Sequence, residues 1–146
     1  TKVLAIETSC DETAVSIVSS NDGIYKIHSN VVASQINDHS KWGGVVPELA
    51  ARKHLELIPS VYEQALKEAN LKIDLIDIIA STVTPGLIRC LRIGSIFART
   101  LCFTHSKPFL GIHHLEGHLS SILFVKDYPK PPFLVLLVSG GHTVLI

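Results

Sequence analysis

The chain has 146 residues, of which 47% are hydrophobic and 18% are charged, a composition typical of a folded globular protein and not of a disordered one. Thirteen basic residues balance thirteen acidic ones, which argues against a stand-alone nucleic-acid-binding domain, since such domains normally carry a basic excess. No apolar run approaches the roughly 18 residues of a membrane span, and no signal peptide is evident. We therefore expect a soluble, cytoplasmic protein. Its three cysteines, Cys10, Cys90 and Cys102, are too scattered for a disulfide framework.

The N-terminal part of the chain predicts three antiparallel strands. Residues 3–6 are a compact apolar run, and residues 14–20 alternate between apolar and polar side chains. Asn21-Asp22-Gly23 is a hairpin turn signal, because Asp and Gly tolerate a positive φ. Residues 24–34 complete the set as a third strand.

Helices and strands then alternate. A helix is predicted from Pro47 to Asn70, where Pro47 is tolerated in the first turn and Pro59 should kink or divide the helix. Gly94 suggests close packing of a second helix. Beyond the first helix, the expected elements are a strand at 75–80, a helix at 87–103, a strand at 109–112, a helix at 113–125, a linker at 129–132, a strand at 133–138 and its hairpin partner at 143–146.

This order predicts an α/β fold with a mixed sheet covered by helices, the ribonuclease-H-like lobe that actin, Hsp70 and sugar kinases share. We expect residues 1–128 to form this lobe. Residues 133–146 resemble the opening of a second lobe of the same kind, which predicts that the chain is truncated.

His114 and His118 stand four residues apart on a predicted helix. At that spacing both rings lie on one face, with Cβ atoms about 6 Å apart, close enough to share one divalent metal. The alternative is that both histidines are half-buried beside the apolar residues of the helix. Two ligands are too few for a metal site, so a third must come from elsewhere. His113 should be a neighbour and not a ligand.

Two loops are further candidates. Ser139-Gly140-Gly141-His142-Thr143 follows an apolar strand, and paired glycines there would let backbone N–H groups approach a phosphate or nucleotide; the alternative is an ordinary tight turn. The loop at 7–13 carries Asp11 and Glu12, two carboxylates that could bind a metal–water shell or orient a reacting group. The alternative is a solvated polar turn.

Five motifs occur together in one known family. They are Glu7-Thr8-Ser9-Cys10-Asp11-Glu12-Thr13, Gly43-Gly44-Val45-Val46-Pro47-Glu48-Leu49-Ala50, Pro85-Gly86-Leu87, His113-His114-Leu115-Glu116-Gly117-His118 and Val138-Ser139-Gly140-Gly141-His142-Thr143. In this order and spacing the chain resembles the bacterial branch of the tRNA N6-adenosine threonylcarbamoyltransferase family, formerly called O-sialoglycoprotein endopeptidase. The resemblance extends from Lys2 to Ile146.

The resemblance implies an actin-like protein of about twice this length. It implies transfer of threonylcarbamoyl from threonylcarbamoyl-adenylate to N6 of adenosine 37, in tRNAs that read codons beginning with A. It makes His114 and His118 ligands of one divalent metal, Fe2+ in first place and Zn2+ as the alternative, with a third ligand beyond residue 146. Asp11 and Glu12 become catalytic, and the adenylate contacts become Leu137, Val138, Ser139, Gly140, Gly141 and His142.

The resemblance also implies partners, which are tRNA, an actin-fold paralogue and a small ATPase. This chain alone should be inactive. Two other functions are compatible with the fold: an ATP-dependent phosphotransferase that uses Asp11 as a base, and a non-catalytic dimerisation paralogue. The histidine pair argues against both. The peptidase function fails because no glutamate directly follows His114, as the metalloprotease motif requires.

Overall fold

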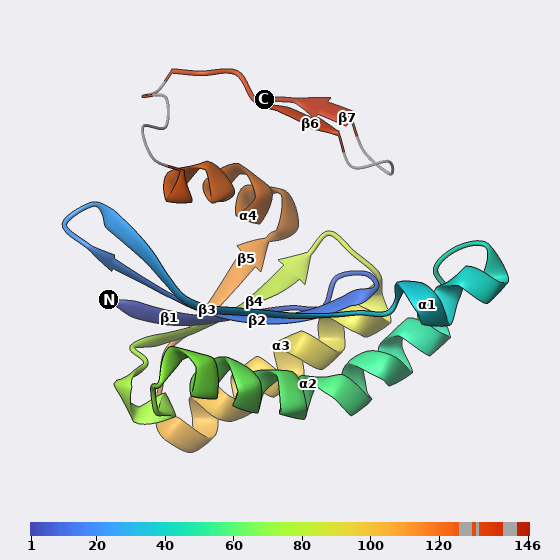
Figure 1. Cartoon of the computed structure of the whole chain (residues 1–146), viewed down its shortest axis with the longest axis horizontal. Coiled ribbons are helices and arrows are strands. Elements are labelled where there is room, and N and C mark those ends of the chain that lie inside the picture. Colours follow the sequence, from blue (N-terminus) through green and yellow to red (C-terminus); the bar gives the residue numbers. More distant parts are fainter. Residues whose placement is uncertain (126–129, 131, 139–142) are drawn as a thin grey trace.

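The computed structural model describes residues 1–125, 130, 132–138 and 143–146, and a five-stranded sheet of order β3-β2-β1-β4-β5 forms its centre (Figure 1). β1 (Lys2–Glu7), β2 (Glu12–Asn21) and β3 (Ile24–Ser34) are antiparallel neighbours. β4 (Ile78–Thr84) is parallel to β1, and β5 (Phe109–His113) is parallel to β4. The three antiparallel strands and the mixed α/β sheet predicted from the sequence are confirmed.

Helices lie on both sides of this sheet. α2 and α3 cover one face, and α4 lies on the opposite side (Figure 1). β6 (Leu136–Val138) and β7 (Thr143–Leu145) pair as a separate antiparallel hairpin, as predicted, although its first strand is shorter than the expected 133–138. The helical elements are α1 (Ile36–His39), η1 (Ser40–Trp42), α2 (Pro47–Ala69), η2 (Ile73–Leu75), α3 (Ile88–His105), α4 (His114–Ser120) and η3 (Ser121–Phe124).

In α2 the regular spacing of buried residues maintains the helix despite a proline in its interior. Its buried residues recur every three or four positions and face the sheet. Pro59 falls between buried Ile58 and Val61 but is itself exposed, so the carbonyl that loses its N–H partner faces water. The helix runs unbroken from Pro47 to Ala69, and the expected division at Pro59 was wrong. The buried residues of this helix are Ala50, His54, Ile58, Val61 and Ala65.

Two other elements differ from the predicted ranges by three residues or more at one end or both. The expected strand at 75–80 begins only at Ile78, because that residue is the first to pair with β1, and residues 73–75 form a 3-10 turn. The expected helix at 113–125 is α-helical only to Ser120. The Ser121 hydroxyl donates to the His118 carbonyl at 2.7 Å, and the chain continues as a 3-10 turn.

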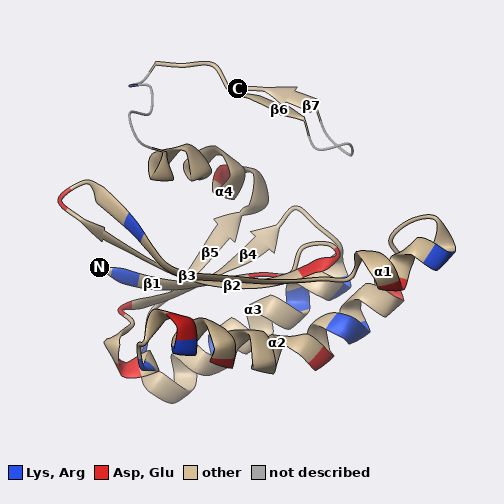
Figure 2. Cartoon of the chain, viewed as in Figure 1, with Lys and Arg blue, Asp and Glu red and all other residues tan. Residues whose placement is uncertain are grey.

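The core lies between the sheet and the helices α2 and α3. Leu4 and Ile6 of β1 and Ile17 of β2 are at most 1% exposed and pack with Ile58 of α2. Acidic and basic residues both occur along α2 (Figure 2). In the part of the chain that the structure describes, no helix combines the length and hydropathy needed to cross a bilayer.

α3 approaches β1 closely at Gly94, as the sequence suggested. The Thr8 hydroxyl donates to the Cys90 carbonyl at 2.8 Å and accepts from the Gly94 N–H at 3.2 Å. A Cβ on Gly94 would overlap this hydroxyl and lie 3.2 Å from the Thr8 methyl group. Thr8 is fully buried, so it has no room to move away.

Replacing Gly94 with alanine should therefore destabilise the chain by about 1–3 kcal/mol, the usual cost of overpacking a buried contact. The matched control is Gly117→Ala on α4, where an added Cβ meets nothing within 4 Å and a helical alanine is favoured. Urea unfolding monitored by circular dichroism measures both variants. Equal free energies of unfolding for the two would contradict the steric explanation.

Candidate functional site

A cavity of about 750 Å³ lies at the edge of the sheet where β1 and β4 end. Parallel neighbouring strands bring their carboxyl ends to the same edge, which is where ligands bind in open α/β sheets. Three motifs far apart in the sequence meet here: the loop after β1, the turn after β4 and the start of α4. The lining residues are Glu7, Ser9, Cys10, Asp11, Glu12, Pro85, Gly86, Leu87, His114 and His118.

The two histidines of α4 face each other in this cavity. Their Nε2 atoms are 3.1 Å apart, and their rings meet edge to face with centroids 4.6 Å apart. Two nitrogen ligands at about 2.0–2.1 Å from one ion are about 2.9–3.4 Å apart, so the observed separation suits a shared metal. Two bare nitrogen lone pairs at this distance repel, so either a proton or a cation must lie between them.

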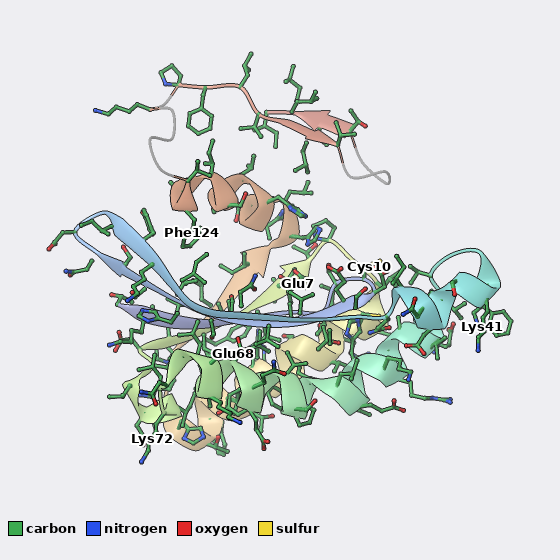
Figure 3. All side chains as sticks on the ribbon, viewed as in Figure 1. Glu7, Cys10, Lys41, Glu68, Lys72 and Phe124 are labelled. Carbon is green, nitrogen blue, oxygen red and sulfur yellow. The ribbon has the colours of Figure 1, made fainter. Side chains whose placement is uncertain are left out.

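Glu7 orients the first of these histidines. The Nδ1–H group of His114 lies 3.3 Å from the Glu7 carboxylate and 3.3 Å from the Ser9 hydroxyl. This arrangement places the proton on Nδ1 and leaves Nε2 free to bind a metal. A carboxylate behind a ligating histidine is the usual outer-shell partner in metal sites. Glu7 lies at the end of β1 on the side of the sheet that carries α4 (Figure 3).

The Glu7 carboxylate is ionised despite its burial. Burial alone would raise its pKa, but hydrogen bonds from Ser9, Thr82 and His114 to the carboxylate outweigh that effect, and the pKa lies below its ordinary value. The backbone N–H of Ser9 and the hydroxyl of Thr82 both donate to this group. Glu7 is therefore a fixed negative charge behind the histidine pair.

The loop that carries Asp11 and Glu12 packs tightly against the turn after β4. The Leu87 N–H donates to the Ser9 carbonyl at 2.8 Å. A Cβ on Gly86 would lie 2.7 Å from that same oxygen, so only glycine allows this approach. Asp11, at the end of this loop, and Glu12, the exposed first residue of β2, both line the cavity.

Cys10 also lines the cavity. Partial burial, together with the neighbouring Asp11 carboxylate, raises its pKa to about 11. A thiol with so high a pKa is almost wholly protonated at neutral pH and is a poor nucleophile.

The remaining candidates from the sequence lie elsewhere. Leu137 and Val138 belong to β6 and are not among the residues that line the cavity. Ser139, Gly140, Gly141 and His142 lie outside the described residues. His113 is no part of the cavity wall: its ring accepts a hydrogen bond from the Leu115 N–H at 3.2 Å and caps α4.

Sequence reasoning missed the roles of Glu7 and Ser9. Glu7 was the first residue of a motif and not a candidate, because its partners Thr82 and His114 are 75 and 107 positions away. An acidic residue at the end of a buried strand was the available signal. Among residues 1–125, 130, 132–138 and 143–146, no group of three His, Cys, Asp or Glu side chains is placed to hold a metal, so the histidine pair gains no third ligand there.

Solved structures share the fold at low sequence identity. YeaZ from Pseudomonas aeruginosa superposes with a TM-score of 0.55 at 18% identity, over 77% of this chain and 45% of that one. RuvC from T. thermophilus, solved with a Holliday junction substrate, superposes with a TM-score of 0.54 at 11% identity, over 90% of this chain and 84% of that one. The Aquifex aeolicus PPX-GPPA enzyme superposes with a TM-score of 0.53 at 14% identity, over 97% of this chain and 46% of that one. These likenesses confirm the ribonuclease-H-like, actin-like fold class.

Curated relatives are far more similar. The enzyme named tRNA N6-adenosine threonylcarbamoyltransferase of Prochlorococcus marinus subsp. pastoris (strain CCMP1986 / NIES-2087 / MED4) is 79% identical over 145 residues, which are 99% of this chain and 41% of the relative. The enzyme of the same name from Prochlorococcus marinus (strain NATL1A) is 58% identical over 144 residues, which are 99% of this chain and 40% of the relative. The chain thus spans about two fifths of their length. The family model TsaD: tRNA N6-adenosine threonylcarbamoyltransferase matches residues 26–146, and the chain belongs to this family.

Proposed function

We propose that this chain is part of an enzyme that transfers the threonylcarbamoyl group of threonylcarbamoyl-adenylate to N6 of adenosine 37 in tRNAs reading codons that begin with A. Family membership supports the reaction class. The observation that carries the proposal is the histidine pair, with Nε2 atoms 3.1 Å apart, in a cavity that Asp11 and Glu12 also line. The spacing of four residues on α4 brings the two imidazoles together, and the tertiary fold places them in the same cavity as the two carboxylates.

The reaction needs positioning more than it needs a strong nucleophile. The adenylate is a mixed anhydride and already activated, so holding it beside the N6 amine lowers most of the barrier. As the new C–N bond forms, the C–O bond to phosphate breaks and AMP leaves with the bonding electrons. The amine proton must pass to a base, and we assign that role to the carboxylates of Asp11 and Glu12.

His114 and His118 would hold one divalent metal in the same cavity. Imidazole ligands suit iron and zinc, and we propose Fe2+ with Zn2+ as the alternative. The bound ion would supply Lewis-acid polarisation of a phosphate or carbonyl oxygen. Glu7 keeps the His114 ring in the orientation that turns Nε2 into the cavity.

The proposed partners follow from the reaction and from the fold. The substrate tRNA is named in the relatives' activity. The likeness to YeaZ from Pseudomonas aeruginosa supports an actin-fold paralogue as a protein partner, and we propose a small ATPase as a second one. Transfer RNA is modified where it is made, so we place the enzyme in the cytoplasm.

Cells whose enzyme carries His114→Ala and His118→Ala together should lose N6-threonylcarbamoyl-adenosine from their tRNA. Mass spectrometry of digested tRNA measures this nucleoside directly. His105→Ala is the matched control, since that histidine lies exposed in the last turn of α3 and is no part of the cavity wall. Wild-type amounts of the modified nucleoside in the double variant would refute the assignment.

Glu7→Gln should weaken metal binding about 10- to 100-fold, the usual effect of removing a carboxylate behind a ligating histidine. Competition against a chelating dye measures the affinity of the full-length enzyme for Zn2+. Glu116→Gln makes the same chemical change on α4 at an exposed position outside the cavity wall and should leave the affinity unchanged. Equal effects of the two changes would rule out the proposed role of Glu7.

Cys10 should be unreactive, as a mechanism without a covalent enzyme intermediate requires. With a pKa of about 11 its alkylation at pH 8 should be on the order of 100-fold slower than that of an ordinary cysteine thiol. The rate of iodoacetamide labelling, followed by peptide mass spectrometry, measures this, with the urea-unfolded chain as control. Labelling as fast in the folded as in the unfolded chain would contradict the raised pKa.

A further inference from the structure

A chain of buried polar side chains lies beside the cavity, between β2, α1 and α2. Thr13, Gln35, His39 and His54 are each at most 3% exposed. The Thr13 hydroxyl lies 2.7 Å from His54 Nδ1, and Gln35 Nε2 lies 3.3 Å from the same atom. Gln35 Oε1 lies 3.1 Å from His39 Nε2. These contacts join four side chains in one hydrogen-bonded network.

Both ends of the network reach the backbone of neighbouring segments. At one end His54 Nε2 lies 2.9 Å from the carbonyl oxygen of Cys10, within the loop that carries Asp11 and Glu12. At the other end the Val46 N–H donates to His39 Nδ1 at 3.3 Å, directly before α2 begins. The Gln35 N–H also donates to the Asp11 carbonyl at 3.0 Å. The loop is thus held twice from the same side.

The donors and acceptors all run in one direction. Because Val46 donates to His39 Nδ1, the His39 proton is on Nε2 and is donated to Gln35 Oε1. The Cys10 carbonyl can only accept, so the His54 proton is on Nε2 and is donated to that carbonyl. His54 Nδ1 then accepts, from the Thr13 hydroxyl at 2.7 Å and more weakly from the Gln35 amide at 3.3 Å. Burial lowers the pKa of His54, which agrees with a neutral ring of this tautomer.

Such a network is a costly way to fill a core. Buried polar groups contribute little net stability even when every partner is present, and apolar side chains of similar volume often stabilise a fold more. What a directional network adds is a fixed geometry at its ends. Its end here is the backbone of the loop whose next two side chains line the cavity.

We propose that His54 is a positioning residue, which sets Asp11 and Glu12 in the cavity by donating its Nε2–H to the Cys10 carbonyl. It touches no substrate and is not among the residues that line the cavity. Gln35 and His39 hold the ring in the tautomer that makes this donation possible. The catalytic meaning of this placement rests on the proposed function, whereas the placement itself does not.

Two conservative variants distinguish the contacts of the two nitrogen atoms of the His54 ring. In His54→Gln the side-chain amide can place an N–H where Nε2 lies and so keep the bond to Cys10. In His54→Asn the shorter amide reaches only the position of Nδ1, so the partner of Thr13 is kept and the Cys10 bond is lost. We expect His54→Asn to lower kcat for threonylcarbamoyl transfer about 100-fold, the effect of a misplacement of about 1 Å, and His54→Gln to restore most of it.

Two further measurements on the full-length enzyme distinguish positioning from a general loss of structure. The affinity for Zn2+ should be unchanged in both variants, because the network does not touch His114 or His118. Hydrogen exchange should be faster in the loop at 10–12 in His54→Asn, and near wild type in His54→Gln. If His54→Asn does not fold, Gln35→Met breaks the same network at similar volume and should show the same faster exchange.

Equal kcat values for the two His54 variants, or unchanged exchange in the loop of His54→Asn, would overturn the inference. If the wild-type enzyme failed to transfer threonylcarbamoyl while the exchange difference between the variants remained, the proposed function would fall and the positioning of the loop by His54 would stand.

Discussion

The carboxylate of Glu7 is the interaction on which the rest of the site depends. It ends β1, accepts from Thr82 of β4 and orients His114 of α4, so it joins three elements that are far apart in the sequence. A buried carboxylate is tolerated only when donors surround it, and here the donors are strong enough to keep its pKa low. The parallel pairing of β1 with β4 is what makes this meeting possible, because it places both carboxyl ends at one edge of the sheet.

The loop between β1 and β2 is held by two sets of contacts, one with the turn after β4 and one with α2. On one side the Leu87 N–H binds the Ser9 carbonyl, and Gly86 leaves the space for that contact. On the other side His54 binds the Cys10 carbonyl. A loop fixed by backbone contacts on both sides can present neighbouring carboxylates at a constant distance from the histidine pair. Such preorganisation is what a positioning mechanism requires.

The fold by itself does not distinguish this chemistry from others. Proteins with the same fold include RuvC, solved with a Holliday junction substrate, and a PPX-GPPA enzyme, and one fold can carry many unrelated functions. The features that distinguish this chain are individual side chains that the shared fold carries, above all the imidazole pair on α4 and the Glu7 carboxylate behind it. The surroundings of Cys10 act on its thiol in the same local way, because burial and the Asp11 carboxylate raise its pKa.

The sequence by itself determined those features that depend only on residues close together in the chain. Alternation and the Asn21-Asp22-Gly23 turn predicted the antiparallel strands, the apolar period predicted α2, and a spacing of four residues put both imidazoles on one face. Only the tertiary structure decided that α2 continues through Pro59, that Glu7 lies behind His114 and that His54 is buried beneath the loop. The reason is physical. The hydrogen bond between Glu7 and His114 spans 107 positions and depends on which strands pair, and the exposure of Pro59 depends on which face of α2 is covered. Neither can be predicted from the spacing of neighbouring residues.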